Sequence, residues 1–207
     1  HTFSMKTSSC LVNPRACNET ELNYTPTDKK KKVAVVGAGA AGMQASIVLD
    51  ERGHDVTLFE AADKIGGQLN MAAVIPGKEE FHGMLGYFAR MIELSNVNVR
   101  LNTRASVNDL DGFDEVIVAT GVTPRDPGIE GQDHPKVLSY IDVLAGNAEV
   151  GEKVAVIGAG GIGFDVTEFL VQEHPSPTVN VEEWLEEWGV GDPEKVPGGL
   201  AAQGPKP

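Results

Sequence analysis

The order of apolar and polar residues predicts a chain in which buried strands alternate with helices. The continuous apolar run at residues 33–36 is typical of a strand that is buried on both faces. Residues 40–52 follow as a predicted helix, and Gly53 stands where glycine commonly ends one. Residues 55–60, DVTLFE, then predict a second strand, so that strand, helix and strand follow closely on one another.

A second helix is predicted over residues 79–94 from the spacing of its apolar side chains. They recur at i, i+3, i+4, i+7 and i+11, which places them along one helical face: Phe81, Met84, Leu85, Phe88 and Ile92. The stretch 61–77 before this helix is predicted to be a loop. Further strands are predicted at residues 97–101, 115–119 and 137–139.

The last part of the chain repeats the opening pattern. Residues 153–157 predict a buried strand, and residues 161–172 predict the helix that follows it. Residues 178–190, TVNVEEWLEEWGV, predict a short acidic amphipathic helix. We expect its two tryptophans to be packing anchors.

Composition narrows the possible partners. Hydrophobic residues make up 41% and charged residues 23% of the 207 residues, which permits a buried core. The net charge of −13 argues against a nucleic-acid partner, and the four lysines at residues 29–32 are expected to be a solvated linker. The sequence has no apolar run of roughly 18 to 20 residues, which argues against a membrane partner. Two cysteines are too few for a disulfide framework, so we expect a reducing, cytoplasmic location.

The stretch VAVVGAGAAG, residues 33–42, carries the first candidate chemistry. Gly37, Gly39 and Gly42 form G-x-G-x-x-G between a predicted strand and a predicted helix. Such glycines allow a tight turn, admit a pyrophosphate to the backbone and let the helix pack close to the strand. Glu60 ends the next strand about 20 residues later, where an acidic residue commonly binds a ribose hydroxyl. The pattern predicts a dinucleotide site, with the phosphates at the positive end of the helix.

The same stretch returns as VAVIGAGGIG, residues 154–163, with Gly158, Gly160 and Gly163 in the corresponding places. Its ribose-binding residue should lie near residues 180–185, but the sequence there is helical in character and no second strand is evident. Either an insertion delays that strand or the chain ends before it, so we expect half a site.

Between the two stretches lies DEVIVATGVTPR, residues 114–125, in which a buried strand ends in a small Ala-Thr-Gly turn. With the two glycine motifs, this turn predicts an α/β, three-layer Rossmann-like fold with two dinucleotide-binding units. One unit would bind FAD and the other a nicotinamide dinucleotide. The pattern resembles the glutathione-reductase-like flavoprotein superfamily.

Further residues resemble one family more closely. SCLVNPRAC, IGGQLN, IPGKEEF, FDEVIVATGVTPR, DHPKVLSY, VAVIGAGGIGFDV, EEWGV and GGL resemble the NADPH-dependent 2,4-dienoyl-CoA reductases, over nearly the whole chain. Trimethylamine-dehydrogenase-like proteins are the next relatives. The resemblance implies an FMN barrel joined through a [4Fe-4S] cluster to an FAD/NADPH module. On this basis residues 1–32 would be the barrel end and a linker, residues 33–150 an incomplete FAD-binding domain, and residues 151–207 the start of an NAD(P)H-binding domain.

The resemblance also implies which residues hold cofactors. The positions matching the FAD site are Gly37, Gly39, Ala41, Gly42, Glu60, Gly67, Gln68, Lys78, Ala105, Thr120 and Gly121. The positions matching the NADPH site are Gly158, Gly160, Gly161 and Gly163. Cys10 matches the last of the four cluster cysteines, whose partners would precede His1, and Cys17 lies outside that pattern. One departure is Ala40, where the family usually has proline, and we expect only a small loss of rigidity there.

The implied mechanism passes electrons from NADPH through FAD and the cluster to FMN, which reduces a 2,4-dienoyl-CoA in unsaturated fatty acid β-oxidation. The acyl-CoA and FMN sites would lie on the barrel, so no residue of this chain is assigned a catalytic role. The alternatives are a related reductase acting on an enoate, a steroid or an amine, and an inactive dinucleotide-binding fragment. In the superfamily the last part of the FAD domain follows the nicotinamide domain. We therefore expect this chain, as a fragment, to bind FAD weakly or not at all and to reduce no dienoyl-CoA.

Overall fold

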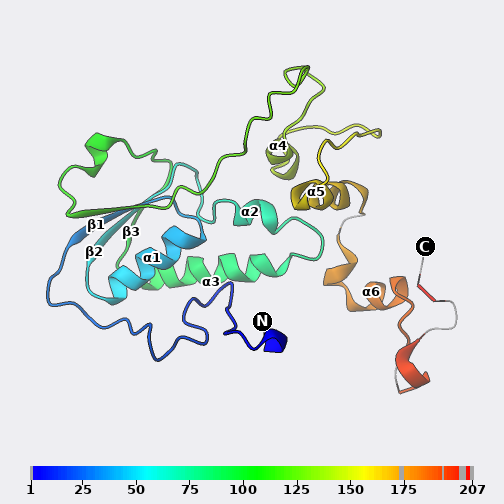
Figure 1. Ribbon diagram of the computed structural model, residues 1–207, viewed down its shortest axis with the longest axis horizontal. Helices are drawn as coiled ribbons and strands as arrows, with labels where there is room; N and C mark the ends of the chain where they lie inside the picture. Colours follow the sequence, from blue (N-terminus) through cyan, green and yellow to red (C-terminus); the bar gives the residue numbers. More distant parts are fainter. Residues whose placement is uncertain (1, 173–174, 193, 201–203, 206–207) are drawn as a thin grey trace. The chain divides into compact units, whose positions relative to one another are not determined.

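The computed structural model describes residues 2–172, 175–192, 194–200 and 204–205, which form two compact units (Figure 1). The first unit comprises His1–Asn70 and His82–Asp126. The second comprises Met71–Phe81 and Pro127–Pro207.

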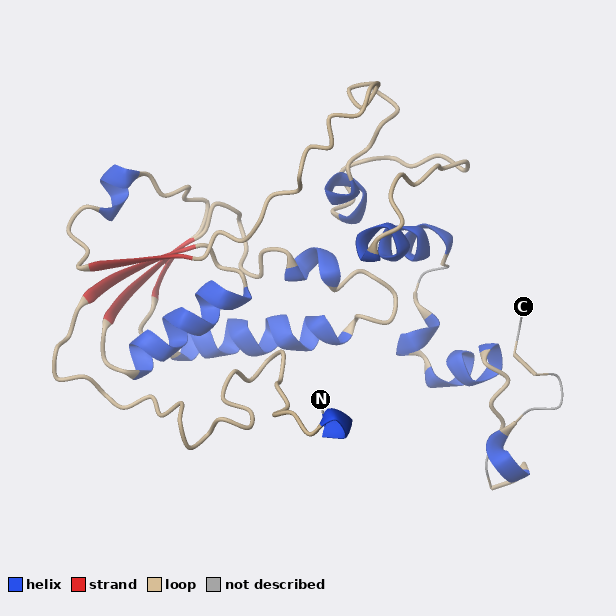
Figure 2. Cartoon of the chain, viewed as in Figure 1, coloured by secondary structure: helices blue, strands red, loops and turns tan. Residues whose placement is uncertain are grey.

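A parallel four-stranded sheet forms the centre of the first unit (Figure 2). Its strands are β1 (Lys32–Val36), β2 (Asp55–Phe59), β3 (Asn98–Arg100) and β4 (Glu115–Val118), in the order β3-β2-β1-β4. All three neighbouring pairs are parallel, and Val35 of β1 is opposite Leu58 of β2 on one side and Ile117 of β4 on the other. The four strands lie within the predicted ranges to one or two residues. The predicted α/β fold is confirmed.

Two long helices lie on the same side of this sheet, α1 (Ala40–Glu51) and α3 (Glu80–Leu94) (Figure 1). The short helix α2 (Leu69–Ala72) lies within the stretch predicted to be a loop. The core contains Val35 and Leu58 from the sheet, and Met43 and Phe88 from the helices, all at most 1% exposed. Burial of each such side chain stabilises the fold by roughly 1.5–3 kcal/mol.

The opposite face of the sheet is covered unevenly. The Phe59 side chain is 1% exposed. The Phe113 ring meets the Phe59 ring edge-on at 6.0 Å, and the Arg100 guanidinium carbon lies 5.4 Å from the Phe59 ring centroid. On β4 the side chains of Val116 and Val118 belong to the same face, but they are 41% and 73% exposed. The sheet therefore keeps an exposed apolar margin at β4.

The helices of the second unit are α4 (Tyr140–Leu144), α5 (Gly161–Val171) and α6 (Val181–Glu187). The chain also has the 3-10 turns Thr2–Ser4, Val107–Leu110, Pro177–Val179 and Pro197–Gly199. Helix α6 begins at Val181 because the Asn180 side chain accepts the N–H groups of Glu182 and Glu183. The acidic helix predicted over residues 178–190 is thus present in shortened form.

The two tryptophans of this segment contact each other, with ring centroids 6.0 Å apart. They are 38% and 57% exposed, at Trp184 and Trp188 respectively. The expectation that they are packing anchors holds for their mutual contact, but neither ring is buried.

Two predicted strands are wrong. Residues 153–157 and 137–139 form no strand in the described part of the second unit. A strand is stable only when its backbone groups pair with a neighbour, and the described residues here contain only an isolated bridge, between Val190 and Leu200. The apolar side chains of the first segment, such as Val154 and Ile157, are accordingly 50% and 79% exposed.

Candidate dinucleotide-binding site

The first glycine loop lies where β1, β2 and β4 end. The Gly37 N–H donates to the carbonyl of Phe59 at 2.8 Å, which attaches the loop to β2. Gly37 has φ of +104°, a conformation that favours glycine. A Cβ placed there would lie 2.4 Å from the carbonyl oxygen of Ala119, so the loop also packs closely against the end of β4.

The second and third glycines of this loop, Gly39 and Gly42, have different structural roles. Gly39 caps helix α1 in an extended conformation, and no described side chain caps this end. A Cβ at Gly39 would meet no described atom within 4 Å, so space lies beside its backbone. A Cβ at Gly42 would lie 1.8 Å from the Gly37 carbonyl oxygen, so Gly42 permits the close helix–strand packing. The N-terminal end of α1, with its partial positive charge, is therefore accessible to an anion beside Gly39.

Glu60 follows β2 directly and lies beside this loop. Its Oε2 accepts the N–H of Ala38 and its Oε1 accepts the N–H of Ala62, both at 2.8 Å. The carboxylate is therefore held between the glycine loop and the turn after β2. Its predicted contact with a ribose stays a prediction, and this placement is compatible with it.

A second loop, around Gly66 and Gly67, packs against the first. The Gly66 N–H donates to the Ala38 carbonyl at 2.8 Å, and a Cβ at Gly67 would lie 3.2 Å from Gly39 Cα. The Gln68 amide donates to the Val122 carbonyl at 2.8 Å, just after the Ala-Thr-Gly turn. These contacts gather seven predicted residues at one edge of the sheet: Gly37, Gly39, Gly42, Gly67, Gln68, Thr120 and Gly121.

Asn70 also belongs to this arrangement, although sequence reasoning missed it. Its amide nitrogen donates to the carbonyls of Ile65 and Gly67, at 3.0 and 3.2 Å. The signal available was an amide side chain close to a glycine pair, since such side chains often bond nearby backbone.

Ala41 and Ala105 have weaker support. Ala41 is exposed in the first turn of α1, at the helix end described above. Ala105 is partly exposed and lies two residues after Thr103, whose N–H donates to the Glu60 carbonyl at 2.8 Å. This bond attaches the loop after β3 to the end of β2. The predicted contact of Ala105 with adenine stays a prediction.

Lys78 is placed in the second unit. Its ammonium forms an ion pair with the Asp165 carboxylate of α5, at 2.6 Å between Nζ and Oδ2. The family resemblance implies that Lys78 contacts FAD, and that contact stays a prediction. The two side chains are 39% and 32% exposed, so solvent screens the pair and it stabilises the fold only modestly.

The neighbouring Glu79 is bonded within the same unit. Its Oε1 accepts the hydroxyl of Thr178 at 2.8 Å. Partial burial raises the pKa of Glu79, but hydrogen bonds from Thr178, from the backbone and from Ser176 outweigh it, so its pKa lies below the ordinary value. Residues 78 and 79 thus attach one segment both to α5 and to the turn before α6.

Acidification is expected to weaken the second unit through Glu79. Because the folded-state pKa is lowered, the stabilisation is present above the unfolded-state pKa of about 4.3 and is lost as the pH falls through the folded value. Urea unfolding between about pH 6 and pH 3 should show a difference between wild type and E79Q of less than about 1 kcal/mol that vanishes at the acid end. Glu152 is an exposed residue of the same unit, and the E152Q variant should have the same free energy of unfolding as wild type at each pH. A difference that grows on acidification would contradict this account.

The second glycine loop repeats the backbone of the first. Gly158 has φ of +122°, and Gly160 caps α5 with φ of −89° and ψ of −178°, against −74° and −178° at Gly39. A Cβ at Gly163 would lie 2.0 Å from the Gly158 carbonyl oxygen. Beside Gly158, Gly160 and Gly161, however, an added Cβ would meet no described atom within 4 Å. The loop is present, without the neighbouring strand ends that surround the first.

Cys10 is exposed, and its Sγ accepts the Asn13 N–H at 3.4 Å. Hydrogen bonds from the backbone of Asn13 and then Val12 lower the pKa of this thiol and so favour the thiolate. Cys17 is exposed and also free. Among the residues that the structure describes, no three metal-ligating side chains gather in one place.

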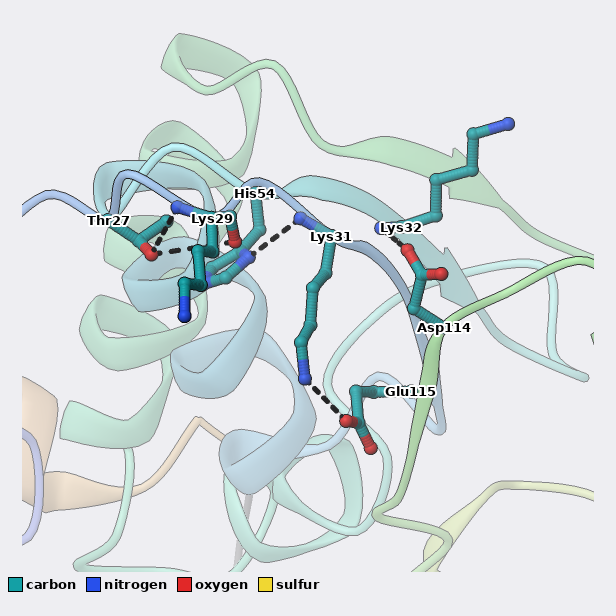
Figure 3. Close-up of polar contacts among 7 residues, drawn as sticks. All are labelled: Thr27, Lys29, Lys31, Lys32, His54, Asp114 and Glu115. Carbon is teal, nitrogen blue, oxygen red and sulfur yellow. Dashed lines mark hydrogen bonds and ion pairs between the residues drawn. The ribbon is translucent and has the colours of Figure 1, made fainter.

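The lysine run ends at the start of β1. Figure 3 shows the hydrogen bonds and the ion pair that Lys31 and Lys32 form with neighbouring residues. Lys31 pairs with Glu115 at 2.6 Å, which raises the pKa of Lys31. The backbone N–H of Lys32 donates to Asp114 at 2.7 Å, and that of Lys31 donates to His54 Nδ1 at 3.3 Å. The run therefore joins β1 to β4 and to the turn before β2.

The described part of the chain contains no helix long and apolar enough to cross a bilayer.

Comparison with known proteins identifies relatives of this arrangement. Residues 31–176 match the model of the family described as pyridine nucleotide-disulphide oxidoreductase. A metal reductase of Desulforamulus reducens is 37% identical over 178 residues, which cover 83% of this chain and 27% of that protein. A cinnamate reductase of Clostridium sporogenes is 38% identical over 175 residues, which cover 84% of this chain and 26% of that protein.

Among solved structures, a 2-naphthoyl-CoA reductase in complex with 2-naphthoyl-CoA matches with a TM-score of 0.75 and 36% identity. The match covers 78% of this chain and 25% of that one. The chain thus spans about a quarter of the length of the proteins that it resembles.

Proposed function

The chain belongs to the pyridine nucleotide-disulphide oxidoreductase family, and we propose that it is the FAD- and NAD(P)H-binding portion of an iron–sulfur flavoprotein reductase. The observation that carries the proposal is the first glycine loop. Gly39 leaves the N-terminal end of α1 accessible, and the Glu60 carboxylate lies beside it. This pairing suits an adenosine diphosphate group, which has an anionic pyrophosphate and ribose hydroxyl donors.

The residues present fit FAD at this loop. The space beside Gly39 would be filled by any Cβ, so it admits a phosphate to the backbone. The Glu60 carboxylate would accept from ribose hydroxyls and would repel a 2′-phosphate, which favours FAD over NADP. Gly67 and Thr120 would line the rest of the cofactor. When bound, FAD supplies the capacity to take up two electrons from a nicotinamide and to release them one at a time.

The second glycine loop supports a nicotinamide dinucleotide site. Gly158, Gly160, Gly161 and Gly163 present the N-terminal end of α5 in nearly the same backbone conformation as the first loop. The ion pair of Lys78 with Asp165 would orient the first two turns of α5. The choice of NADPH over NADH follows from the family resemblance alone.

The proposed [4Fe-4S] cluster would take Cys10 as one ligand. The backbone N–H groups directed at its sulfur favour the thiolate, which is the form that binds metal. Its remaining ligands, the FMN and the acyl-CoA substrate would be held outside this chain.

For the reaction we favour reduction of a 2,4-dienoyl-CoA. Similarity to a reductase solved with an aryl-CoA thioester supports a CoA-linked unsaturated substrate. The relative named cinnamate reductase favours a second candidate, a free enoate. A protein that contains this chain can be assayed with both substrates and with an amine, and turnover of the amine alone would contradict a reductase function.

Titration of the chain with FAD and with FMN tests the site itself. Any binding of FAD should be weak, saturable and one-to-one, and it is measured as quenching of the flavin fluorescence. FMN lacks the adenosine diphosphate group and should show no saturable binding. Equal binding of FMN and FAD would contradict the assignment of the first loop.

A further inference from the structure

Two amide side chains, Gln68 and Asn70, hold the loops of the first dinucleotide site: Asn70 bonds within the second loop, and Gln68 bonds that loop to the segment after β4. We infer that they form an amide clasp that sets the geometry of the FAD site before the cofactor arrives. Both act on backbone carbonyls of the protein, so they are positioning residues. The inference deepens the proposed function and depends on it for the identity of the cofactor.

Asn70 shapes the second loop from within. Its amide nitrogen bonds two carbonyls of the same loop, those of Ile65 and Gly67. The approach is so close that a Cβ at Gly66 would lie 2.7 Å from this nitrogen. Gly66 and Gly67 both have positive φ, +112° and +51°, and the Asn70 bonds offset the tendency of such a loop to relax.

Gln68 joins that loop to the segment after β4. Its amide donates to the Val122 carbonyl at 2.8 Å. The Val122 side chain is 75% exposed and contributes little packing, and Gly121 before it has φ of +73°. A hydrogen bond to the backbone is therefore an effective way to fix the direction of the chain at this point.

The connection continues to the phosphate-binding loop. The Gly66 N–H bonds the Ala38 carbonyl, and Gly67 packs against Gly39. Three loops that line the proposed FAD site are thus linked: Gly66 and Gly67 join the first two, Gln68 joins the third, and Asn70 braces the second from within. A site ordered in advance binds more tightly, because less conformational entropy is lost on binding. The family resemblance had placed Gln68 against the cofactor, whereas its donor group here is used by Val122.

Hydrogen exchange on the cofactor-free chain tests the clasp directly. Q68A should speed exchange of the Ala119 amide, which donates to Val36 where the segment leaves β4, by about three- to tenfold, the effect of losing one net hydrogen bond. Q68E has nearly the same size but no donor, and it should do the same. N70A should instead speed exchange at residues 65–68. The second glycine loop, residues 158–163, provides an internal reference that should not change.

Q44A on helix α1 is the matched control and should leave exchange of the Ala119 amide unchanged. Slow exchange at the β1 amides shows that a variant is folded. If Q68A does not fold, the same local exchange is measured on Q68E. FAD titration of the same proteins should show affinity reduced by a similar factor. Weakened FAD binding with unchanged exchange would overturn the inference, because Gln68 would then contact FAD itself. Faster exchange in a chain that binds no FAD in any form would support the clasp and reject the proposed function.

Discussion

Replacement of Gly42 by alanine is expected to destabilise the first unit by about 3 kcal/mol or more. The added Cβ would overlap the Gly37 carbonyl oxygen at 1.8 Å and would also approach Ala119 Cβ at 3.4 Å. Gly37 cannot retreat easily, because its own N–H is bonded to Phe59 and the Ala119 carbonyl closes off its other side. Helix α1 would have to move away from β1, and buried side chains such as Met43 would lose contacts.

Urea unfolding followed by circular dichroism measures this loss, with Gly83→Ala as the matched control. Gly83 lies inside helix α3, and a Cβ there would meet no described atom within 4 Å. Alanine at this position should raise stability by roughly 0.5–1 kcal/mol through helix propensity. Equal effects of the two substitutions would show that the packing of Gly42 does not govern stability.

Replacement of Gly39 by valine is expected to abolish FAD binding while the fold persists. Gly39 has φ of −74° and ψ of −178°, which any residue adopts, and an added side chain would enter open space. That space is where the proposed pyrophosphate would approach the N-terminal end of α1. FAD affinity should fall by more than about tenfold, whereas stability should change by no more than about 1 kcal/mol, the effect of a poorer N-cap.

Gly160→Val makes the same change in the second loop. Comparison of the two variants distinguishes the cofactor bound at the first loop from the cofactor bound at the second. This variant should leave FAD binding unchanged and weaken binding of the nicotinamide dinucleotide. Flavin fluorescence titration and a thermal melt of each variant provide both measurements. If Gly39→Val binds FAD as wild type does, the pyrophosphate does not lie beside Gly39 and the proposed site is wrong.

Much of the first unit could be predicted from sequence because its signals are local. The apolar strands and the spacing of Met84, Phe88 and Ile92 are set by periodicity, and the core confirms them. The roles of Gly37 and Gly42 also follow from residue type and spacing, because a left-handed turn and a close backbone approach each require glycine.

The features that could not be predicted depend on partners distant in the sequence. The apolar stretch 153–157 looks like a strand, but strand formation requires a neighbour that the described second unit does not provide. The pairing of Lys78 with Asp165 joins residues 87 positions apart, and spacing cannot reveal it. The bond from Gln68 to Val122 spans 54 positions and is equally hidden from spacing, whereas the cofactor contact of Gln68 that the resemblance implies stays untested.

The glycine loop depends partly on local sequence and partly on distant partners. Its glycine turn adopts nearly the same backbone twice, at Gly37 and Gly39 among three strand ends and at Gly158 and Gly160 where residues 153–157 form no strand. The conformation is therefore encoded in the stretch itself. The surroundings decide whether the loop becomes part of a complete site.

The exposed margin at β4 has a practical consequence for handling the molecule. Within the described residues β4 pairs with β1 alone, and Val116 and Val118 lie beside its other, unpaired edge. An open edge flanked by β-branched apolar side chains is a template for intermolecular strand pairing and aggregation. At high protein concentration, aggregation through this edge would then limit experiments before cofactor affinity does. The substitution Val118→Lys would be a rational means to improve solubility.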